Sequence, residues 1–257
     1  MAEPAIPLIE AHGLRKEFRR RGGGTPVVAV DDVSLSILPG QTFGLAGTSA
    51  AGKSTIGRII MGLTPGDAGE IFFEGKKLPA GGAYSREVRA RMQMVFQNPA
   101  LSMNPRRTAA ATIELPMQAL GVGTRKERRE RVAELLNLVG LSPRHAHYYP
   151  HEFSGGQCQR LGIARALAST PRFVFLDEPV SALDVSIQAQ ILNLLKDLQE
   201  RLALTYLFVA NNLNVTRFMC DHLAIVHRGR IIESGSTDEI FEAPKTDHSK
   251  KLLSALI

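Results

Sequence analysis

The sequence predicts an α/β fold in which a mostly parallel sheet forms the core and helices cover it. Short apolar runs of strand type alternate with segments of helical periodicity along most of the chain, as in the βα units that build parallel sheets. Two regions depart from this alternation. The first forty residues hold only β-type runs, which indicates an N-terminal β subdomain. Residues from about 98 to 165 are mostly helical, which indicates an inserted helical subdomain.

The individual elements follow from the apolar runs and from the residues that stop them. A turn at residues 39–41 closes the second β-type run. Gly62 and Pro65 end the first helix, and Pro99 ends the strand that begins at residue 91. The expected strands cover residues 7–14, 27–38, 42–47, 69–75, 91–99, 172–179 and 205–212, with a final hairpin at 222–235. Helices are expected at 53–63, at 186–202 and, as a short helix, after residue 212.

The composition describes an ordinary globular protein. The chain has 257 residues, of which 44% are hydrophobic and 22% charged, and these are the values of a water-soluble domain. No apolar run approaches the roughly 18 residues that a transmembrane helix needs. The first ten residues carry acid and prolines, so we expect no signal peptide. Cys158 and Cys220 match no metal or disulfide spacing and suit a reducing cytoplasm.

The charge balance is mildly basic, with a formal net charge of +6 and a pI near 9.5. The densest basic cluster, residues 125–131, is interleaved with glutamates and leads into Val132, Leu135, Leu136 and Val139. These apolar residues share one face of a helix, so the charges cover the opposite face. A solvated helix face is preferred to a nucleic-acid patch, and we expect no nucleic-acid partner.

A glycine-rich loop provides the first chemical motif. Residues 47–55 follow the pattern G-x-x-x-x-G-K-[ST] between an expected strand and an expected helix, which is the context that a phosphate-binding P-loop requires. Backbone N–H groups and the helix N-terminus would bind phosphate oxygens, Lys53 would bridge the β- and γ-phosphates, and Ser54 would ligate Mg²⁺. The expected nucleotide-binding residues of this loop are Gly47, Thr48, Ser49, Ala50, Ala51, Gly52, Lys53, Ser54 and Thr55.

A pair of carboxylates lies at the end of the strand at residues 172–179. Asp177 follows an apolar run and would hold the Mg²⁺ shell, and Glu178 beside it would polarise an attacking water. An Asp-Glu pair after a strand is also typical of a solvated turn. The P-loop upstream favours the catalytic interpretation.

A third motif, Ser154, Gly155, Gly156 and Gln157, begins a helix about twenty residues before the carboxylate pair. It is either an N-cap with a glycine-rich entry or a second anion-binding helix N-terminus. With the pair and the following segment 179–184, it resembles the signature motif, Walker B and D-loop of ATP-binding cassette (ABC) ATPases. Gln97 is similar to the Q-loop residue of that family, Phe18 to its adenine-stacking aromatic, and Asp184 to its D-loop aspartate.

The resemblance covers essentially the whole chain, and it implies a fold, an activity and cofactors. We expect residues 1–257 to form one ABC ATPase domain with a P-loop α/β core, an N-terminal antiparallel β subdomain and the inserted helical subdomain. ATP and Mg²⁺ would be the cofactors, with Ser54, Gln97 and Asp177 around the metal. In this family the signature motif acts on ATP held by the P-loop of a second cassette.

Other stretches are similar to the dipeptide, oligopeptide and nickel importer branch of the family, for example residues 96–108, 177–199 and 248–257. The branch implies a second, different ATPase subunit, two membrane permeases and an extracytoplasmic binding protein. The chain would lie peripherally on the cytoplasmic face of the inner membrane. Members often continue past the final segment, and the end of this sequence raises nickel or metallophore import as an alternative to peptide import.

Two positions depart from the family pattern. Asn211 and Asn212 follow the strand at 205–212, and Asn211 stands where the family has its switch histidine, which contacts the γ-phosphate. On local grounds the two asparagines are typical of a turn or a helix cap. Ala50 stands where glycine is usual. If this position needs a positive φ, alanine costs about 1 kcal/mol relative to glycine.

We therefore predict an ATPase subunit of a peptide importer. A catalytically impaired nucleotide-binding subunit of a heterodimer is the alternative that Asn211 and Ala50 support, whereas Glu178 opposes it. A soluble cassette acting on DNA or ribosomes is disfavoured, because such proteins typically carry two cassettes or a long coiled-coil insertion and this sequence has neither.

Overall fold

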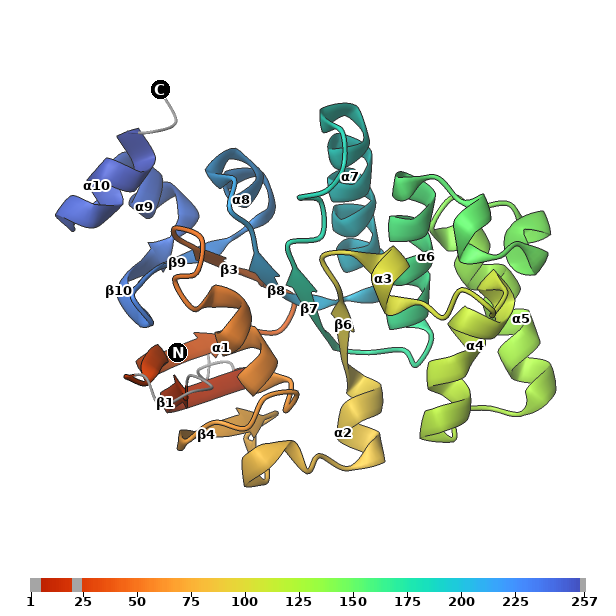
Figure 1. Ribbon diagram of the computed structural model, residues 1–257, viewed down its shortest axis with the longest axis horizontal. Helices are drawn as coiled ribbons and strands as arrows, with labels where there is room; N and C mark the ends of the chain where they lie inside the picture. The colour runs from red at the N-terminus through yellow and green to blue at the C-terminus, as the bar shows by residue number, and fades with distance from the viewer. Residues whose placement is uncertain (1–5, 20–24, 255–257) are drawn as a thin grey trace, which may run out of the picture. The chain divides into compact units, whose positions relative to one another are not determined.

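The computed structural model describes residues 6–19 and 25–254 (Figure 1). The chain divides into two compact units. Unit 1 consists of Met1–Tyr84 and Thr205–Ile257, and unit 2 of Ser85–Leu204.

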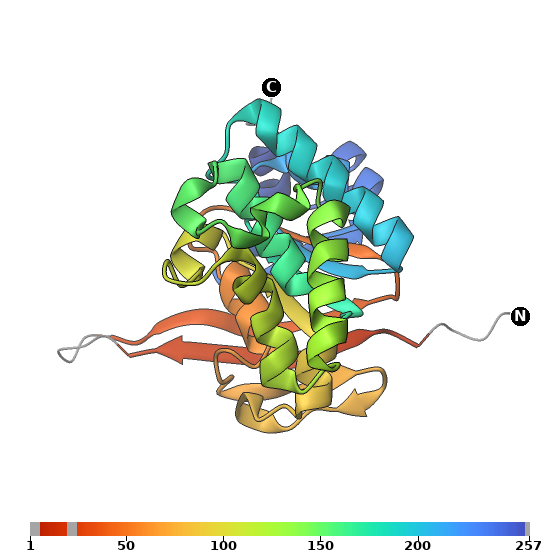
Figure 2. The ribbon, with the colours of Figure 1, turned by 90° about the vertical axis from the view of Figure 1, so that its right-hand side faces the viewer.

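Unit 1 begins with an antiparallel sheet. Its strand order is β2-β1-β4-β5, and β1 pairs with both β2 and β4. The strands are β1 Ile9–Phe18, β2 Val27–Ile37, β4 Ala68–Phe73 and β5 Lys76–Lys77, and the long β1–β2 ribbon is seen in Figure 2. Alternating buried and exposed residues along β2 show that one face of this sheet packs on a core. The sheet is the expected N-terminal β subdomain, and its antiparallel pairing is confirmed.

Parallel strands form the second layer of unit 1. β3 (Thr42–Ala46) lies between β8 (Thr205–Val209) and β9 (His222–His227) and is parallel to both. β10 (Arg230–Ser236) returns antiparallel to β9. Every residue of β3 and β8 is buried, as in parallel strands that are covered on both faces. This layer confirms the α/β prediction.

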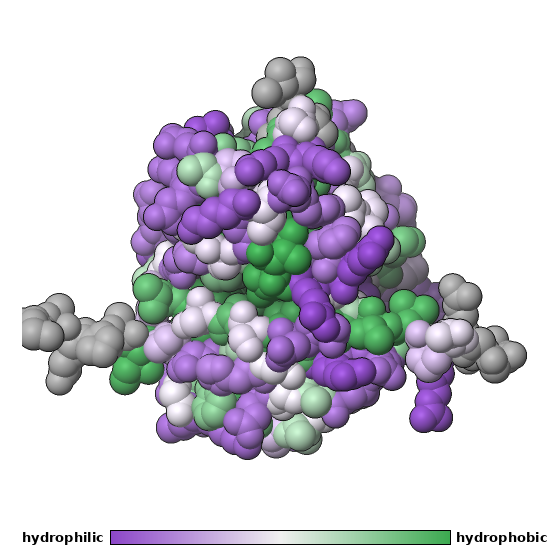
Figure 3. All heavy atoms as spheres, turned by 90° about the vertical axis from the view of Figure 1, so that its left-hand side faces the viewer, coloured by the Kyte–Doolittle hydropathy of each residue, from purple (hydrophilic) through white to green (hydrophobic). Residues whose placement is uncertain are grey.

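The helices of unit 1 pack on these strands. They are α1 Lys53–Ile60, α8 Leu213–Met219, α9 Thr237–Glu242 and α10 Asp247–Ser254, with a 3-10 turn at Ala80–Gly82. Leu213 of α8 and Ile240 of α9 join β3 and β9 in one apolar cluster, against which Leu252 and Leu253 of α10 pack. Figure 3 shows the face at the left of Figure 1, where apolar atoms gather in a band across a largely polar surface.

Unit 2 combines a strand pair with a group of helices. β6 (Met92–Val95) and β7 (Phe173–Asp177) run parallel. The helices are α2 Arg86–Arg91, α3 Pro99–Ser102, α4 Ala109–Leu120, α5 Arg125–Leu138, α6 Gly155–Leu167 and α7 Val185–Leu202, with 3-10 turns at Pro143–His147 and Pro150–Glu152. α4 packs against both α5 and α6 (Figures 1 and 2).

The basic cluster has the structure that its periodicity predicts. In α5, Val132, Leu135 and Leu136 are buried, and most of residues 125–131 are exposed. Thr124 and Glu127 form a capping box at the start of this helix. The solvated helix face is therefore confirmed. Among the described residues, no helix is long and apolar enough to cross a membrane.

Candidate functional site

The glycine-rich loop of unit 1 links β3 to α1 and is shaped by two close backbone approaches. Gly47 has φ +148°, and a Cβ there would lie 2.2 Å from the carbonyl oxygen of Val226. Gly52 has φ +107°, and a Cβ there would lie 2.2 Å from the carbonyl oxygen of Ala29. Neither position has room for a side chain. The two glycines let the loop lie tightly against β2 and β9 and leave residues 48–50 exposed.

Ala50 has φ +62°, which is the left-handed region. A non-glycine residue there costs about 1 kcal/mol. Ala50 does need a positive φ, so the loop carries backbone strain that a glycine at this position would not have.

The lysine of the loop is buried. Lys53 is 4% exposed, and its Nζ donates hydrogen bonds to the carbonyl oxygens of Gly47 and Thr48, each over 2.9 Å. α1 begins after Gly52, with no side chain capping its N-terminus. The first N–H groups of a helix attract anions. A buried ammonium beside such a helix start makes the loop a fitting site for phosphate groups.

The two asparagines have different roles. The Oδ1 of Asn212 accepts hydrogen bonds from the backbone N–H of Asn214 over 2.9 Å and of Val215 over 3.4 Å, so Asn212 is the N-cap of α8. Asn211 is exposed at the end of β8. In the β3–β8 register Leu45 pairs with Val209, so Asn211 follows β8 at the edge where the glycine-rich loop follows β3. The cap interpretation is right for Asn212 alone.

Phe18 ends β1 in unit 1. Its side chain is 44% exposed, and the Nζ of Lys16 lies 5.6 Å from the ring centroid. An exposed aromatic ring is available for stacking on a ligand.

Unit 2 brings together Gln97 and Glu178, which are 81 residues apart in the sequence. The Nε2 of Gln97 donates to Oε2 of Glu178 over 2.9 Å and to Oγ of Ser181 over 3.3 Å. Asp177, the last residue of β7, is 2% exposed, and Glu178 has φ +48°. Sequence reasoning missed Ser181. Its only signal is its place between Glu178 and Asp184.

The glycine motif of unit 2 begins α6. The Oγ of Ser154 accepts a hydrogen bond from the N–H of Gln157, and Oε1 of Gln157 accepts one from the N–H of Ser154. This capping box is the structural role weighed for the motif, and it leaves Ser154 and Gly155 exposed. A Cβ on Gly156 would lie 2.6 Å from Cγ2 of Ile187. Asp184 is exposed at the N-cap position of α7, where its side chain makes no capping hydrogen bond.

The carboxylate of Asp177 fits a hard cation such as Mg²⁺ when a bound substrate supplies some of the other oxygen ligands. Among the described residues, no group of at least three His, Cys, Asp or Glu could hold a metal by itself. Mg²⁺ usually binds through one or two carboxylates together with substrate phosphates. A single buried carboxylate, Asp177, suits that mode of binding.

Comparisons with known proteins agree with these motifs. Residues 30–181 match the family model described as ABC transporter. The chain is similar to the oligopeptide transport ATP-binding protein OppF of Bacillus subtilis, with 46% identity over 97% of this chain and 82% of that protein. It is 45% identical to the dipeptide transport ATP-binding protein DppF of Lactococcus lactis, over 100% of this chain and 83% of that protein.

A solved structure has a similar fold. It is the dimer of the ATP-binding cassette MJ0796 in a post-hydrolysis state bound to ADP and Pi. The TM-score is 0.78 and the sequences are 31% identical, over 89% of this chain and 98% of that one.

Proposed function

We propose that this chain, which belongs to the ABC transporter family and is an ATPase, energises the import of peptides. The observation that carries the proposal is the similarity to peptide transport ATP-binding proteins, at 43–47% identity over 93–100% of the chain. These relatives are named for oligopeptide, dipeptide or peptide transport, so nickel import is kept only as a comparison in the test.

The P-loop is proposed to hold the ATP phosphates. Lys53 supplies a buried positive charge, and the N-terminus of α1 supplies N–H groups. Thr48, Ser49 and Ala50 are exposed, so a ligand can reach the loop. Phe18 is proposed to stack on the adenine, which its exposed ring supports.

Ser54, Gln97 and Asp177 are proposed to hold Mg²⁺, which would offset the negative charge of the phosphates when bound. Glu178 is proposed as the group that polarises the attacking water. The hydrogen bond from Gln97 keeps the Glu178 carboxylate in one orientation, which suits a general base. Asn211 occupies the proposed switch position.

The exposed N-terminus of α6 is proposed to act on ATP held by a second, different ATPase subunit, with Asp184 at the same contact. Two membrane permeases and an extracytoplasmic binding protein complete the assembly. A permease would contact the surface formed by Gln97 and residues 98–108, where Leu101 is 85% exposed. The chain would then be peripheral on the cytoplasmic face of the inner membrane.

A second candidate is a subunit that binds ATP but turns it over slowly. The positive φ of Ala50 and the amide of Asn211 favour it. It differs from the first candidate in rate and not in fold or partners.

Co-expression tests the function. The chain alone and the chain with its permeases would be fractionated, and ATP turnover of the complex would be measured with binding protein loaded with an oligopeptide or with Ni²⁺. We expect membrane recovery only with permeases and stimulation by the peptide. Membrane recovery without permeases, or stimulation by Ni²⁺ alone, would contradict the proposal.

A further inference from the structure

The turn between β9 and β10 contacts the P-loop through backbone atoms. The N–H of Gly229 donates to the carbonyl oxygen of Ala51 over 2.9 Å. The carbonyl oxygen of the same glycine accepts from the N–H of Asp31 in β2, also over 2.9 Å. One residue therefore connects the P-loop to the antiparallel sheet.

A β-bulge makes the N–H of Asp31 available for this contact. β1 and β2 pair Leu14 with Val33 and Lys16 with Val30, so Asp31 and Asp32 together oppose one residue of β1. Asp32 has φ +56°. A bulge leaves a residue out of the ladder and bends the strand, and here it releases the Asp31 N–H for the turn.

The turn and the P-loop are packed without intervening side chains. Gly229 has φ +80°, and a Cβ there would lie 2.9 Å from the carbonyl oxygen of Ala29. A Cβ on Gly52 would lie 3.4 Å from the Cα of Gly229. The P-loop, β2 and this turn therefore meet backbone to backbone, so a movement of the P-loop alone would break the Gly229–Ala51 hydrogen bond.

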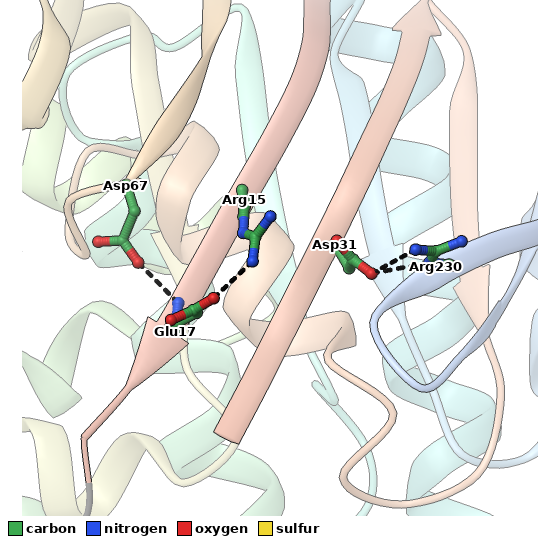
Figure 4. A network of polar contacts seen from close by, with 5 residues as sticks. All are labelled: Arg15, Glu17, Asp31, Asp67 and Arg230. Carbon is green, nitrogen blue, oxygen red and sulfur yellow. Dashed lines mark hydrogen bonds and ion pairs between the residues drawn. The ribbon is translucent and has the colours of Figure 1, made fainter. Parts of the chain in front are cut away.

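An ion pair also joins the end of this turn to β2. The Nε and Nη2 of Arg230 lie 2.8 and 2.7 Å from Oδ2 of Asp31 (Figure 4). The side chain of Asp31 is 25% exposed, whereas that of Arg230 is 65% exposed. Arg230 and Asp31 flank the Gly229 backbone contacts, so the pair holds the turn where Gly229 meets the P-loop.

The loop that this turn supports is strained at Ala50. A strained conformation persists only where the surroundings determine it strongly, and Gly229 binds the carbonyl of the next residue. We propose that Gly229 and the Arg230–Asp31 pair are positioning residues that hold the P-loop in its phosphate-binding conformation and so raise nucleotide affinity. This inference rests on the proposed binding of nucleotide at residues 47–55.

Titration calorimetry with ADP on the full chain tests the inference. An exposed or partly exposed ion pair contributes up to about 1 kcal/mol, so Arg230→Ala should weaken ADP binding about two- to fivefold. The double variant Asp31→Arg/Arg230→Asp should restore most of the affinity. Lys77→Ala is the matched control, because it breaks the Lys77–Glu70 pair between β5 and β4 of the same sheet and should leave affinity unchanged.

Thermal unfolding of the same variants separates positioning from general stability. If Arg230→Ala and Lys77→Ala lower the midpoint equally but only Arg230→Ala weakens ADP binding, the inference is supported. Equal ADP affinity in the native chain and in Arg230→Ala overturns it. An absence of ADP binding by the native chain would overturn the proposed nucleotide site itself.

Discussion

The amide of Gln97 donates a hydrogen bond to the carboxylate of Glu178 over 2.9 Å and a second one to the hydroxyl of Ser181 over 3.3 Å. The hydroxyl of Ser181 in turn donates to the backbone carbonyl of Glu178 over 3.2 Å. Glu178 has a positive φ, and backbone strain of this kind gathers at functional sites. These contacts orient the Glu178 carboxylate.

Glu178→Gln should nearly abolish ATP turnover. Glutamine keeps the size of the side chain but cannot accept a proton, and general base catalysis contributes about 10²–10⁴-fold. The measurement is phosphate release by the assembled transporter in which the catalytic glutamate of the second ATPase subunit is replaced, so that only this chain's site turns over, with ADP affinity as the control. Ser181→Ala should cost far less, since it removes only a partner of Gln97. Turnover close to that of the native chain would exclude Glu178 as the base.

Lys53→Ala should weaken ATP binding at least tenfold. A hydrogen bond to a charged group contributes about 1.5–3 kcal/mol, and Lys53 is the buried ammonium of the P-loop. Calorimetric titration with ATP checks this, and Lys77→Ala on exposed strand β5 is the control. Equal affinities of Lys53→Ala and the native chain would show that the loop does not bind phosphate.

Asn212→Ala should lower stability and leave turnover unchanged, whereas Asn211→Ala should lower turnover and leave stability nearly unchanged. Loss of an N-cap costs about 0.5–2 kcal/mol, so Asn212→Ala should lower the free energy of unfolding while Asn211→Ala leaves it nearly unchanged. Turnover should fall only for Asn211→Ala once both proteins are assayed well below their unfolding midpoints. Denaturant unfolding provides one readout, and phosphate release with the catalytic glutamate of the second ATPase subunit replaced provides the other. The assignment fails if Asn211→Ala is the destabilising variant.

The sequence predicted what local patterns determine. Apolar runs located the buried strands β3, β7 and β8, and the pattern G-x-x-x-x-G-K-[ST] located the loop between β3 and α1. The pattern could not tell which of the two adjacent asparagines caps α8, because the same residue type stands at both positions. The short helices α2 and α10 lacked a long periodic signal and were not predicted.

Contacts between segments that are far apart in the sequence could not be predicted either. The N–H of Asp31, in the β-bulge, donates a hydrogen bond to Gly229, which lies almost two hundred residues later. The pairing of Gln97 with Ser181 requires that β6 and β7 lie side by side. Such contacts are set by tertiary packing, which composition and spacing do not encode locally.

Glu233 of β10 should contribute stability that is lost in acid. It is 8% exposed and accepts hydrogen bonds from the N–H groups of Lys245 and Thr246, ahead of α10. Burial raises the pKa of this carboxyl, but hydrogen bonds from Ser249, Lys245 and Thr246 outweigh burial and hold the pKa below its ordinary value of 4.5.

Because the folded-state pKa lies below the unfolded value, the contribution is complete above pH 4.5 and disappears as the pH falls through the folded-state pKa. Glu233→Gln should therefore destabilise the chain by about 1.5–3 kcal/mol at pH 7 and by progressively less as the pH falls through the folded-state pKa of Glu233. Urea unfolding over a series of pH values from 7 downward measures the difference. A destabilisation that is independent of pH would mean that Glu233 acts through packing rather than charge.

The last prediction concerns Asn211 in the assembled transporter. A neutral amide can donate one hydrogen bond to a γ-phosphate oxygen, but it is shorter than histidine and cannot become charged. Loss of a charge-assisted contact in the transition state costs about 1.5–3 kcal/mol, or roughly ten- to a hundredfold in rate. The site on this chain's own P-loop would be slow, while its α6 N-terminus would still complete the site of a different partner. We therefore predict a heterodimer with unequal sites, in which Asn211→His raises ATP turnover severalfold or more. Asn214→His, at an exposed position of α8, is the control and should change nothing.

The comparison is repeated with the catalytic glutamate of the second ATPase subunit replaced, so that only this chain's site turns over. If native Asn211 and Asn211→His then give equal and substantial rates, the amide serves as well as an imidazole and the two sites are not unequal for this reason.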